Sequence, residues 1–188
     1  MKLAIATIAL ATAFAAPAFA ADSYTIDPNH TRPLFEINHF GFSTQHGRFG
    51  KAAGKISLDT GAKKGNVELT IDTASIDMGT DKWNSHMKSE DFFNVEKFPA
   101  MTFKSDKLVF DGDKVVGAEG SFTLLGVTKP LKVAVTNFRC AQNPMLKKDF
   151  CGGDVSVTIK RSDYGMTKYL PAVGDDVKIF VPVEAMKD

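Results

Sequence analysis

Alternation of apolar and polar residues runs through most of the chain after the first twenty positions. Val67, Leu69 and Ile71 alternate with polar neighbours, and the same pattern recurs in the runs 131–135 and 155–159. A period of two places every apolar side chain of a strand on one face, so each run predicts a β-strand with one solvent-facing side. Turn sequences rich in Gly and Asp separate the runs. The pattern therefore predicts a single antiparallel all-β domain.

The number and length of these runs favour a closed barrel over a two-layer sandwich. About eight runs must bury one apolar face, and both architectures satisfy that need. Three runs, 46–59, 114–125 and 175–186, exceed the usual strand length of about five or six residues. Internal glycines mark bends or bulges that curl a sheet shut, and they lie at positions 50, 54, 117 and 120. We therefore expect an eight-stranded antiparallel barrel.

One segment departs from the alternation and is expected to be a short helix. Across residues 80–88, Trp83 and Met87 stand four positions apart. Residues at this spacing share one face of a helix. The helix would thus present two large apolar side chains to whatever it covers.

Aromatic residues follow this helix directly, in the stretch SEDFFNVEKFP. Phe92 and Phe93 are adjacent, which fits neither the strand period nor the helix period for a single apolar face, and Phe98 precedes a proline. Together with the helix, these side chains would form an aromatic lid over one end of the barrel, although the pattern alone does not favour this interpretation. The alternative is that they plug the barrel and complete its core.

The first twenty residues have the composition of a cleaved export signal. Lys2 precedes an uncharged, mostly apolar run over residues 3–16, and small residues at Ala18 and Ala20 form a cleavage signal before Ala21. The run is shorter than the ~20 residues that span a bilayer. An uncleaved anchor or a buried helix is the alternative. We expect residues 1–20 to be a signal peptide and residues 21–188 the mature domain.

Charge balance argues against an anionic partner. The chain carries 23 Lys and Arg against 22 Asp and Glu, and Lys2 belongs to the export segment, so the mature chain is neutral. Nucleic acid or an anionic membrane surface would require a basic patch. We therefore expect no nucleic-acid binding and no stable insertion into a membrane.

The two cysteines, Cys140 and Cys151, are expected to form a disulfide. In an exported protein a single pair close in sequence most simply forms one bridge. A redox or metal-binding pair is the alternative, but the spacing is not CxxC and no histidine lies nearby.

Two polar residues occupy positions where the strand alternation otherwise places apolar, inward-facing side chains. His39 follows Phe35 and Ile37 at alternate positions, and Arg161 continues the alternation of the 155–159 run, so both are expected to point inward near strand ends. In one interpretation they stand at the cavity mouth and bind the head group of a ligand. In the other, His39 caps a turn and Arg161 pairs with a carboxylate such as Asp163.

The sequence contains no recognisable catalytic or metal-binding motif. Its four histidines show no HExxH spacing, and it has no GxSxG elbow and no glycine-rich phosphate loop. We therefore expect no metal and no catalytic residue. An enzyme that uses His39 with Arg161, such as an isomerase or a hydrolase, is the less favoured alternative.

Five stretches of the chain carry a resemblance to a known family. They are, in order, Phe35–Gly41, His46–Phe49, Ser89–Pro99, Thr123–Pro130 and Arg161–Gly165. These stretches resemble the motifs of the YceI-like family of secreted, mostly periplasmic bacterial proteins, and the resemblance covers nearly the whole mature chain, from Tyr24 to Ala185. One departure is visible at residues 82–87, where the family often shows Arg-Asp-x-His-Leu and this chain has KWNSHM.

The resemblance implies a lipocalin-like barrel that holds a polyisoprenoid or a related lipid in the periplasm, with no other cofactor required. The expected role is transport, storage or stress protection, without enzymatic activity, and pairing into a homodimer is compatible with it. A ligand-free interaction module is the alternative. His39 and Arg161 are the expected polar contacts. The expected apolar contacts are Phe35, Ile37, Phe49, Val67, Leu69, Trp83, Met87, Phe92, Phe93, Phe103, Phe122, Val157 and Ile179.

Overall fold

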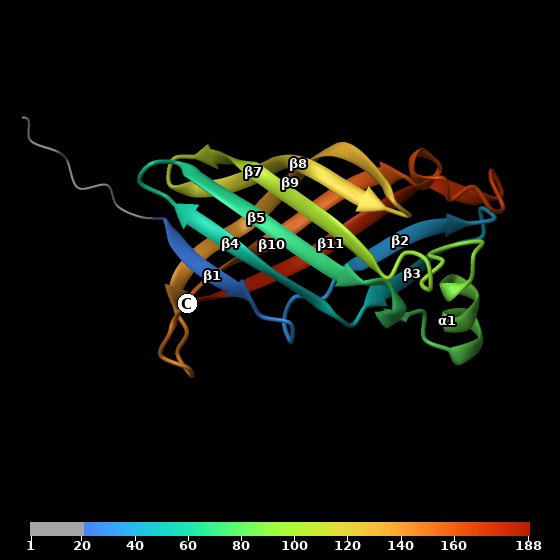
Figure 1. The fold of residues 1–188 in the computed structure, drawn as a ribbon, viewed down its shortest axis with the longest axis horizontal. Coiled ribbons are helices and arrows are strands. Elements are labelled where there is room, and N and C mark those ends of the chain that lie inside the picture. The colour runs from blue at the N-terminus through green and yellow to red at the C-terminus, as the bar shows by residue number, and fades with distance from the viewer. Residues whose placement is uncertain (1–20) are drawn as a thin grey trace, which may run out of the picture.

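The computed structural model describes residues 21–188, which form one antiparallel barrel with a short helix at one end (Figure 1). The expected signal peptide, residues 1–20, lies outside the described residues. The strands are β1 Asp22–Ile26, β2 Leu34–His39, β3 Ser43–Phe49, β4 Ala52–Asp59, β5 Lys64–Asp72, β6 Ile76–Asp77, β7 Ala100–Asp111, β8 Lys114–Leu124, β9 Val127–Gln142, β10 Asp149–Lys160 and β11 Val173–Lys187. The helices are α1 Asp81–Lys88 and the 3₁₀ turns Thr73–Ser75 and Arg161–Tyr164.

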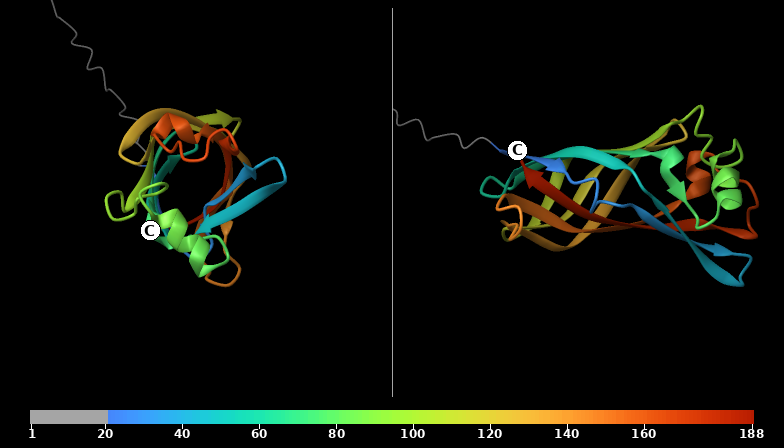
Figure 2. Two further views of the ribbon diagram at one scale, coloured as in Figure 1. Left: turned by 90° about the vertical axis from the view of Figure 1, so that its right-hand side faces the viewer. Right: turned by 90° about the horizontal axis from the view of Figure 1, so that it is seen from below.

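Eight of the strands close into a ring, which confirms the expected barrel. They follow the order β1, β4, β5, β7, β8, β9, β10 and β11, and β11 pairs back onto β1. All neighbours in the ring are antiparallel. Figure 2 shows the ring end-on, with the helix across one opening.

Strand β11 has two partners on the same edge. Near its C-terminus it pairs with β1, with Lys187 opposite Tyr24, and in its first half it pairs with β2, with Val177 opposite Ile37. Strands β3 and β6 extend the sheet beyond β2. The β2–β3 hairpin therefore branches from the barrel at the end where α1 lies (Figure 2).

The prediction of one long strand over residues 46–59 is wrong. The chain forms β3 and β4 instead, which are separated at Gly50 and Lys51. The Gly50 N–H donates to the Ser75 carbonyl at 3.0 Å, so the backbone turns here to meet a different segment. The other two long runs are continuous strands, β8 and β11.

The predicted helix is confirmed as α1. Thr80 caps it, because its side-chain oxygen accepts from the Trp83 N–H at 3.3 Å. The following stretch consists of successive turns, in which the Phe93 N–H donates to the Met87 carbonyl at 3.0 Å. The aromatic segment is thereby held directly against the last turn of the helix.

A β-bulge shifts the inward parity of β9. Asn137 has a φ of 55°, and the pairing with β10 changes register between Gly152 and Asp154. One extra residue reverses which side chains face inward beyond the bulge. Val135 on one side of Asn137 and Phe138 on the other therefore both face the interior.

Candidate functional site

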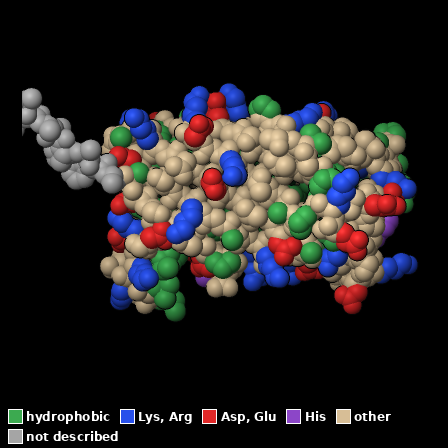
Figure 3. Space-filling model, in the orientation of Figure 1, with side chains coloured by type: hydrophobic (Ala, Val, Ile, Leu, Met, Phe, Trp, Pro, Cys, Tyr) green, Lys and Arg blue, Asp and Glu red, His purple; other side chains and the backbone are tan. Residues whose placement is uncertain are grey.

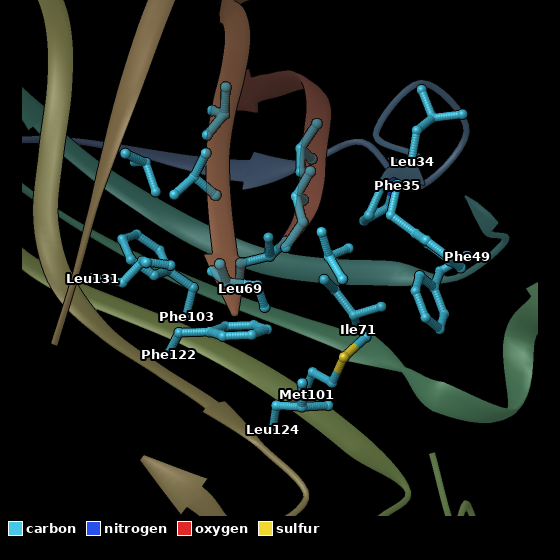
Figure 4. A pocket seen from close by; sticks show the side chains of 18 of the residues that line it. Leu34, Phe35, Phe49, Leu69, Ile71, Met101, Phe103, Phe122, Leu124 and Leu131 are labelled. Atoms are coloured by element: carbon cyan, nitrogen blue, oxygen red, sulfur yellow. The ribbon is translucent and has the colours of Figure 1, made fainter. Parts of the chain in front are cut away.

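The barrel encloses a cavity of about 450 Å³ whose walls are almost entirely apolar (Figure 4). Every ring strand contributes inward residues to its wall, with Ile26 alone from β1; Leu69 and Ile71 of β5 and Met101 and Phe103 of β7 are examples of the alternation. This volume lies within the ~300–1,000 Å³ typical of ligand pockets. The alternation read from the sequence thus corresponds to a cavity wall.

All the residues expected to contact a ligand lie on this wall. The structure brings together side chains from β2, β3, β5, α1, the aromatic segment, β7, β8, β10 and β11. Their contact with a ligand stays a prediction. The apolar members are Phe35, Ile37, Phe49, Val67, Leu69, Trp83, Met87, Phe92, Phe93, Phe103, Phe122, Val157 and Ile179, and the polar members are His39 and Arg161.

Several wall residues were not named from the sequence. Leu131 and Val155 carried a signal, since they belong to the alternating runs. Gln45 has the parity of Phe49 on β3, and His86 lies three positions after Trp83 on α1, so spacing could have found both. Tyr169 also lines the cavity but carried no signal, because it lies in a loop. With His39 and Arg161, these three residues supply polar side-chain atoms to a mostly apolar wall.

The four lid residues Trp83, Met87, Phe92 and Phe93 cover one end of the cavity. Phe93 is buried deepest among them: its ring meets that of Phe49 edge-on at 5.3 Å between centroids. Such aromatic pairs contribute ~0.5–1.5 kcal/mol beyond the area they bury. The lid is therefore part of the packed core and part of the cavity wall at once.

Phe98, which was expected to belong to the lid, lies outside the cavity. It is absent from the cavity wall, and its ring packs over Gly126, where an added Cβ would meet it at 2.9 Å. Its carbonyl accepts a hydrogen bond from the Thr73 hydroxyl at 2.7 Å. Phe98 thus holds the segment to the outside of the barrel end.

Arg161 is 2% exposed and its guanidinium is surrounded by backbone carbonyls. Its Nε donates to Gly174 at 2.8 Å, Nη1 to Met166 at 2.9 Å and Nη2 to Val173 at 3.0 Å. Burial lowers the pKa of Arg161, and the charge of Asp175 opposes that shift. The side chain thereby ties the loop after β10 to the start of β11.

The carboxylates around Arg161 have other partners. Asp163, the partner considered from the sequence, pairs with Lys129 at 3.4 Å. Asp175 accepts from the N–H and the hydroxyl of Ser162 at 2.9 and 2.8 Å. Burial raises the pKa of Asp175, but these two hydrogen bonds, together with the charges of Lys160 and Arg161, hold that pKa below its ordinary value.

His39 lies at the open end of β2, half-buried, and its ring meets Phe40 edge-on at 4.4 Å. It lines the cavity together with Gln45 of β3. The structure therefore separates the two polar residues by role: Arg161 is bonded to backbone, whereas His39 stands at the mouth.

The disulfide between Cys140 and Cys151 is confirmed. The two residues lie directly opposite each other on β9 and β10, with Cα atoms 4.1 Å apart. The bridge is at the end of the barrel remote from α1 (Figure 1). Both cysteines lie within strands, and residues 143–148 form the connecting turn.

Among residues 21–188, Asp27, His30 and Glu184 bring three ligand-type atoms within 4.8 Å of one another. The group is on the surface and none of the three residues lines the cavity. His30 Nδ1 lies 2.7 Å from Asp27 Oδ2, and this hydrogen bond and the charges of Asp27 and Glu184 raise the pKa of His30. We assign these residues to the pairing of the first loop with β11. Within the same residues, no helix is long and apolar enough to cross a membrane.

The chain is similar to a family of bacterial proteins over nearly all its described length. A family model described as the YceI-like domain matches residues 24–185. A UPF0312 protein from Shewanella denitrificans is 32% identical over 161 residues, which are 84% of this chain and 83% of that protein. A UPF0312 protein from Pectobacterium atrosepticum is 32% identical over 154 residues, 81% of this chain and 79% of that protein.

Solved structures with the same fold cover most of the chain. BcnA of Burkholderia cenocepacia superimposes with a TM-score of 0.69 at 25% identity, over 85% of this chain and 98% of that one. The YceI protein of Campylobacter jejuni gives 0.67 at 25% identity, over 80% and 90%. A polyisoprenoid binding domain from Saccharophagus degradans gives 0.64 at 16% identity, over 88% and 98%. The last of these likenesses establishes the fold alone.

Proposed function

Because the chain belongs to the YceI-like family, we propose that it binds a long polyisoprenoid or an isoprenoid-quinone lipid inside its barrel. The cavity of about 450 Å³ with an apolar wall is the observation that carries this proposal. The name of the Saccharophagus degradans domain, which has the same fold, points to the same class of ligand.

Apolar contact supplies the affinity in this proposal. Each methylene group of a ligand moved from water into the barrel contributes ~0.8 kcal/mol. An isoprenoid tail therefore needs few polar partners, which agrees with a wall on which polar side chains are rare. Selectivity among tails is expected to be broad, because an apolar pocket discriminates by only ~1–3 kcal/mol per methylene.

The ligand's polar head is placed at the mouth, where His39 and Gln45 lie. Arg161 is less suited to this contact, since each of its three guanidinium nitrogens already donates to a backbone carbonyl. We accordingly assign the head-group contact to His39 and a positioning role to Arg161.

We place the protein in the periplasm as a carrier, store or protective binder of this lipid. The Cys140–Cys151 disulfide supports an oxidising compartment. The expected export signal, residues 1–20, would deliver the chain there.

Organic extraction of protein isolated from its native periplasm, followed by mass spectrometry, tests the binding proposal. A stoichiometric isoprenoid lipid is the expected result. Protein that carries none, and takes up none from a mixture of isoprenoids, would instead favour an interaction module. Chemical conversion of an added lipid would identify an enzyme.

A pair of variants on β10 links the lipid to the cavity. Val157→Phe adds an aromatic ring to the inner wall, and Thr158→Phe adds the same ring to the outer face, where Thr158 is exposed. We expect the first variant to reduce the bound lipid and the second to leave it unchanged. Equal lipid content in both would place the lipid outside the barrel.

A further inference from the structure

Two loops at the mouth present exposed aromatic side chains to solvent. Phe42, at the tip of the β2–β3 hairpin, is 91% exposed, and Phe40 and Tyr169 are 47% and 46% exposed. We call the two segments that carry them, residues 38–45 and 169–173, the aromatic rim. They lie side by side, since the Phe40 N–H donates to the Ala172 carbonyl at 2.9 Å.

The aromatic rim contains no Lys, Arg, Asp or Glu, although 24% of the chain consists of these residues. Charged side chains normally surround exposed aromatic residues on a soluble protein. The two segments of the rim together contain thirteen residues, none with a formal charge, and a backbone hydrogen bond joins them. A surface of this size without charge is unusual. Such a surface suits contact with an apolar or zwitterionic partner rather than a charged one.

The turn of the β2–β3 hairpin places an aromatic residue at a position where its backbone conformation is unfavourable. Phe40 and Gly41 both have positive φ, 55° and 73°, and the Phe42 N–H donates to the His39 carbonyl at 3.1 Å. Asn, Asp or Gly is favoured at the first of these positions, because a bulky side chain is strained there. Local strain of this kind gathers at functional sites.

The exposed aromatics continue the apolar surface of the cavity. Phe40 and Tyr169 each line the cavity as well as facing solvent. Tyr169 also contacts the lid, with its ring 6.2 Å from that of Phe92. Apolar side chains therefore lie both on the cavity wall and on the hairpin, whose tip projects beyond the barrel at the end where α1 lies (Figure 2).

We propose that the aromatic rim inserts into the interfacial layer of a phospholipid bilayer and docks the mouth there. The lipid can then pass between membrane and cavity without crossing water. Aromatic side chains partition into this layer, and a few of them give reversible binding without anchoring. The rim itself carries no formal charge, and the neighbouring Lys168, whose ammonium lies 5.5 Å from the Tyr169 ring centroid, is paired with Asp91 at 3.1 Å. Docking should therefore depend little on salt or on anionic lipid. The role in lipid transfer rests on the proposed function.

The chain provides an internal control at its other end. Met145, in the β9–β10 turn, is 88% exposed and is followed by Leu146, Lys147 and Lys148. This tip has a comparable apolar exposure but is flanked by cations and is remote from the mouth (Figure 3 shows apolar side chains at both ends). Membrane contact through this tip would be strengthened by anionic lipid and weakened by salt.

Sedimentation of lipid-free protein with phosphatidylcholine vesicles, with and without phosphatidylglycerol, tests the docking. We expect Phe42→Ser to lower the partition coefficient about tenfold or more, and Met145→Ser to leave it unchanged. Partitioning of the wild type should differ little between the two kinds of vesicle and between low and high salt. Absent binding, equal losses in both variants, or binding that requires phosphatidylglycerol would overturn the proposal.

A transfer measurement separates this proposal from the proposed function. Wild type and Phe42→Ser are loaded with a fluorescent isoprenoid analogue and mixed with vesicles. The variant should release the analogue into vesicles about tenfold more slowly, with its affinity for the analogue in vesicle-free solution unchanged. Vesicle binding without uptake of the analogue would refute the proposed function alone. Uptake with equal transfer rates would refute the docking alone.

Discussion

The two ends of the barrel are closed in different ways. At the end remote from α1, short hairpin turns join the strands, and the Cys140–Cys151 bridge and the chain terminus tie them together (Figure 1). At the mouth, two long connections, residues 78–99 and 161–172, fold over the opening and pack aromatic side chains into it. Covalent and charged contacts fix specific partners, whereas apolar contacts are non-directional. The first end is therefore held by specific partners, and the second by apolar packing, which the proposed lipid would replace in part.

Asp188 shows how the fixed end is held. Its carboxylate accepts hydrogen bonds from the hydroxyls of Ser23 and Thr25 and pairs with Lys55 at 2.8 Å. These contacts join the last residue of the chain to β1 and β4. The mouth also has polar contacts, since Arg161 bonds to the start of β11 and Lys168 pairs with Asp91 at 3.1 Å across the two connections. Its cavity is nevertheless covered by apolar rings, where Phe93 packs against Phe35 and Phe49.

Truncation of Phe93 to alanine is expected to have the largest effect. Removal of a buried phenylalanine costs ~3–5 kcal/mol of the free energy of unfolding. Because Phe93 also forms cavity wall, release of a bound isoprenoid analogue should accelerate more than tenfold. Denaturant unfolding of lipid-free protein and stopped-flow release measure the two effects.

Phe98→Ala is the matched control, since Phe98 lies in the same segment but outside the cavity. It should lower stability without changing release. If both variants changed release equally, the lid would act through segment order and not as cavity wall.

Substitution of Arg161 tests the hydrogen bonds that join the loop after β10 to the start of β11 at the mouth. Arg161→Met leaves three carbonyls without their donor, each at a cost of ~1–3 kcal/mol, so the free energy of unfolding should fall by about 3 kcal/mol or more. Arg161→Lys keeps the charge but not the planar guanidinium, so it should recover only part of the lost free energy of unfolding. A stable Arg161→Met variant with altered lipid preference would restore the head-group role to Arg161.

Removal of the disulfide should weaken the fixed end alone. Cys140→Ser opens a short loop and should lower the free energy of unfolding by about 3 kcal/mol. Release of the isoprenoid analogue should stay at the wild-type rate, because the bridge is remote from the lid. Freely alkylated thiols in native, unreduced protein would contradict the premise.

Acidic pH should lower the free energy of unfolding by less than removal of the disulfide does, through the contacts of Asp188. Hydrogen bonds from Lys55, Ser23 and Thr25 hold the pKa of Asp188 far below its ordinary value. A carboxyl group with a depressed pKa stabilises the fold above its unfolded-state pKa, and this contribution is lost as the pH falls towards the folded-state pKa. Asp188→Asn should therefore narrow the stability difference between neutral and acidic pH, as thermal unfolding can measure. An unchanged pH profile would show that the contact contributes nothing in solution.

Much of the barrel could be read from the alternation, because its inner face is uniformly apolar. Val157 and Ile159 were placed inward by parity alone, and the structure has both on the cavity wall. The separation of β3 from β4 was missed, because a glycine inside a long run signals a bend and a break equally well. The bulge at Asn137 was also missed, since it depends on pairing with a distant part of β10.

The site was predictable to the extent that it is apolar. Parity placed Arg161 inside, but its partners are backbone carbonyls of residues 166, 173 and 174, and carbonyls leave no signature in a sequence. Tyr169 was missed because loop geometry, not periodicity, brings it to the mouth. Gln45 shares the parity of Phe49 on β3, but a polar side chain two positions before a glycine gives no apolar signal. Phe98 shares its segment with Phe92 and Phe93, and only the turn geometry directs it outward.

Because β11 pairs with β1 and with β2 along different parts of its length, the β2–β3 hairpin is structurally independent of ring closure. Ring closure depends on the pairing of Lys187 with Tyr24, while the hairpin is attached through Val177 and Ile37 farther along the same strand. Insertions or replacements between residues 39 and 43 therefore leave the strand number and the stagger of the ring untouched. Changes in the length or sequence of this hairpin can therefore alter the proposed membrane contact without altering the barrel.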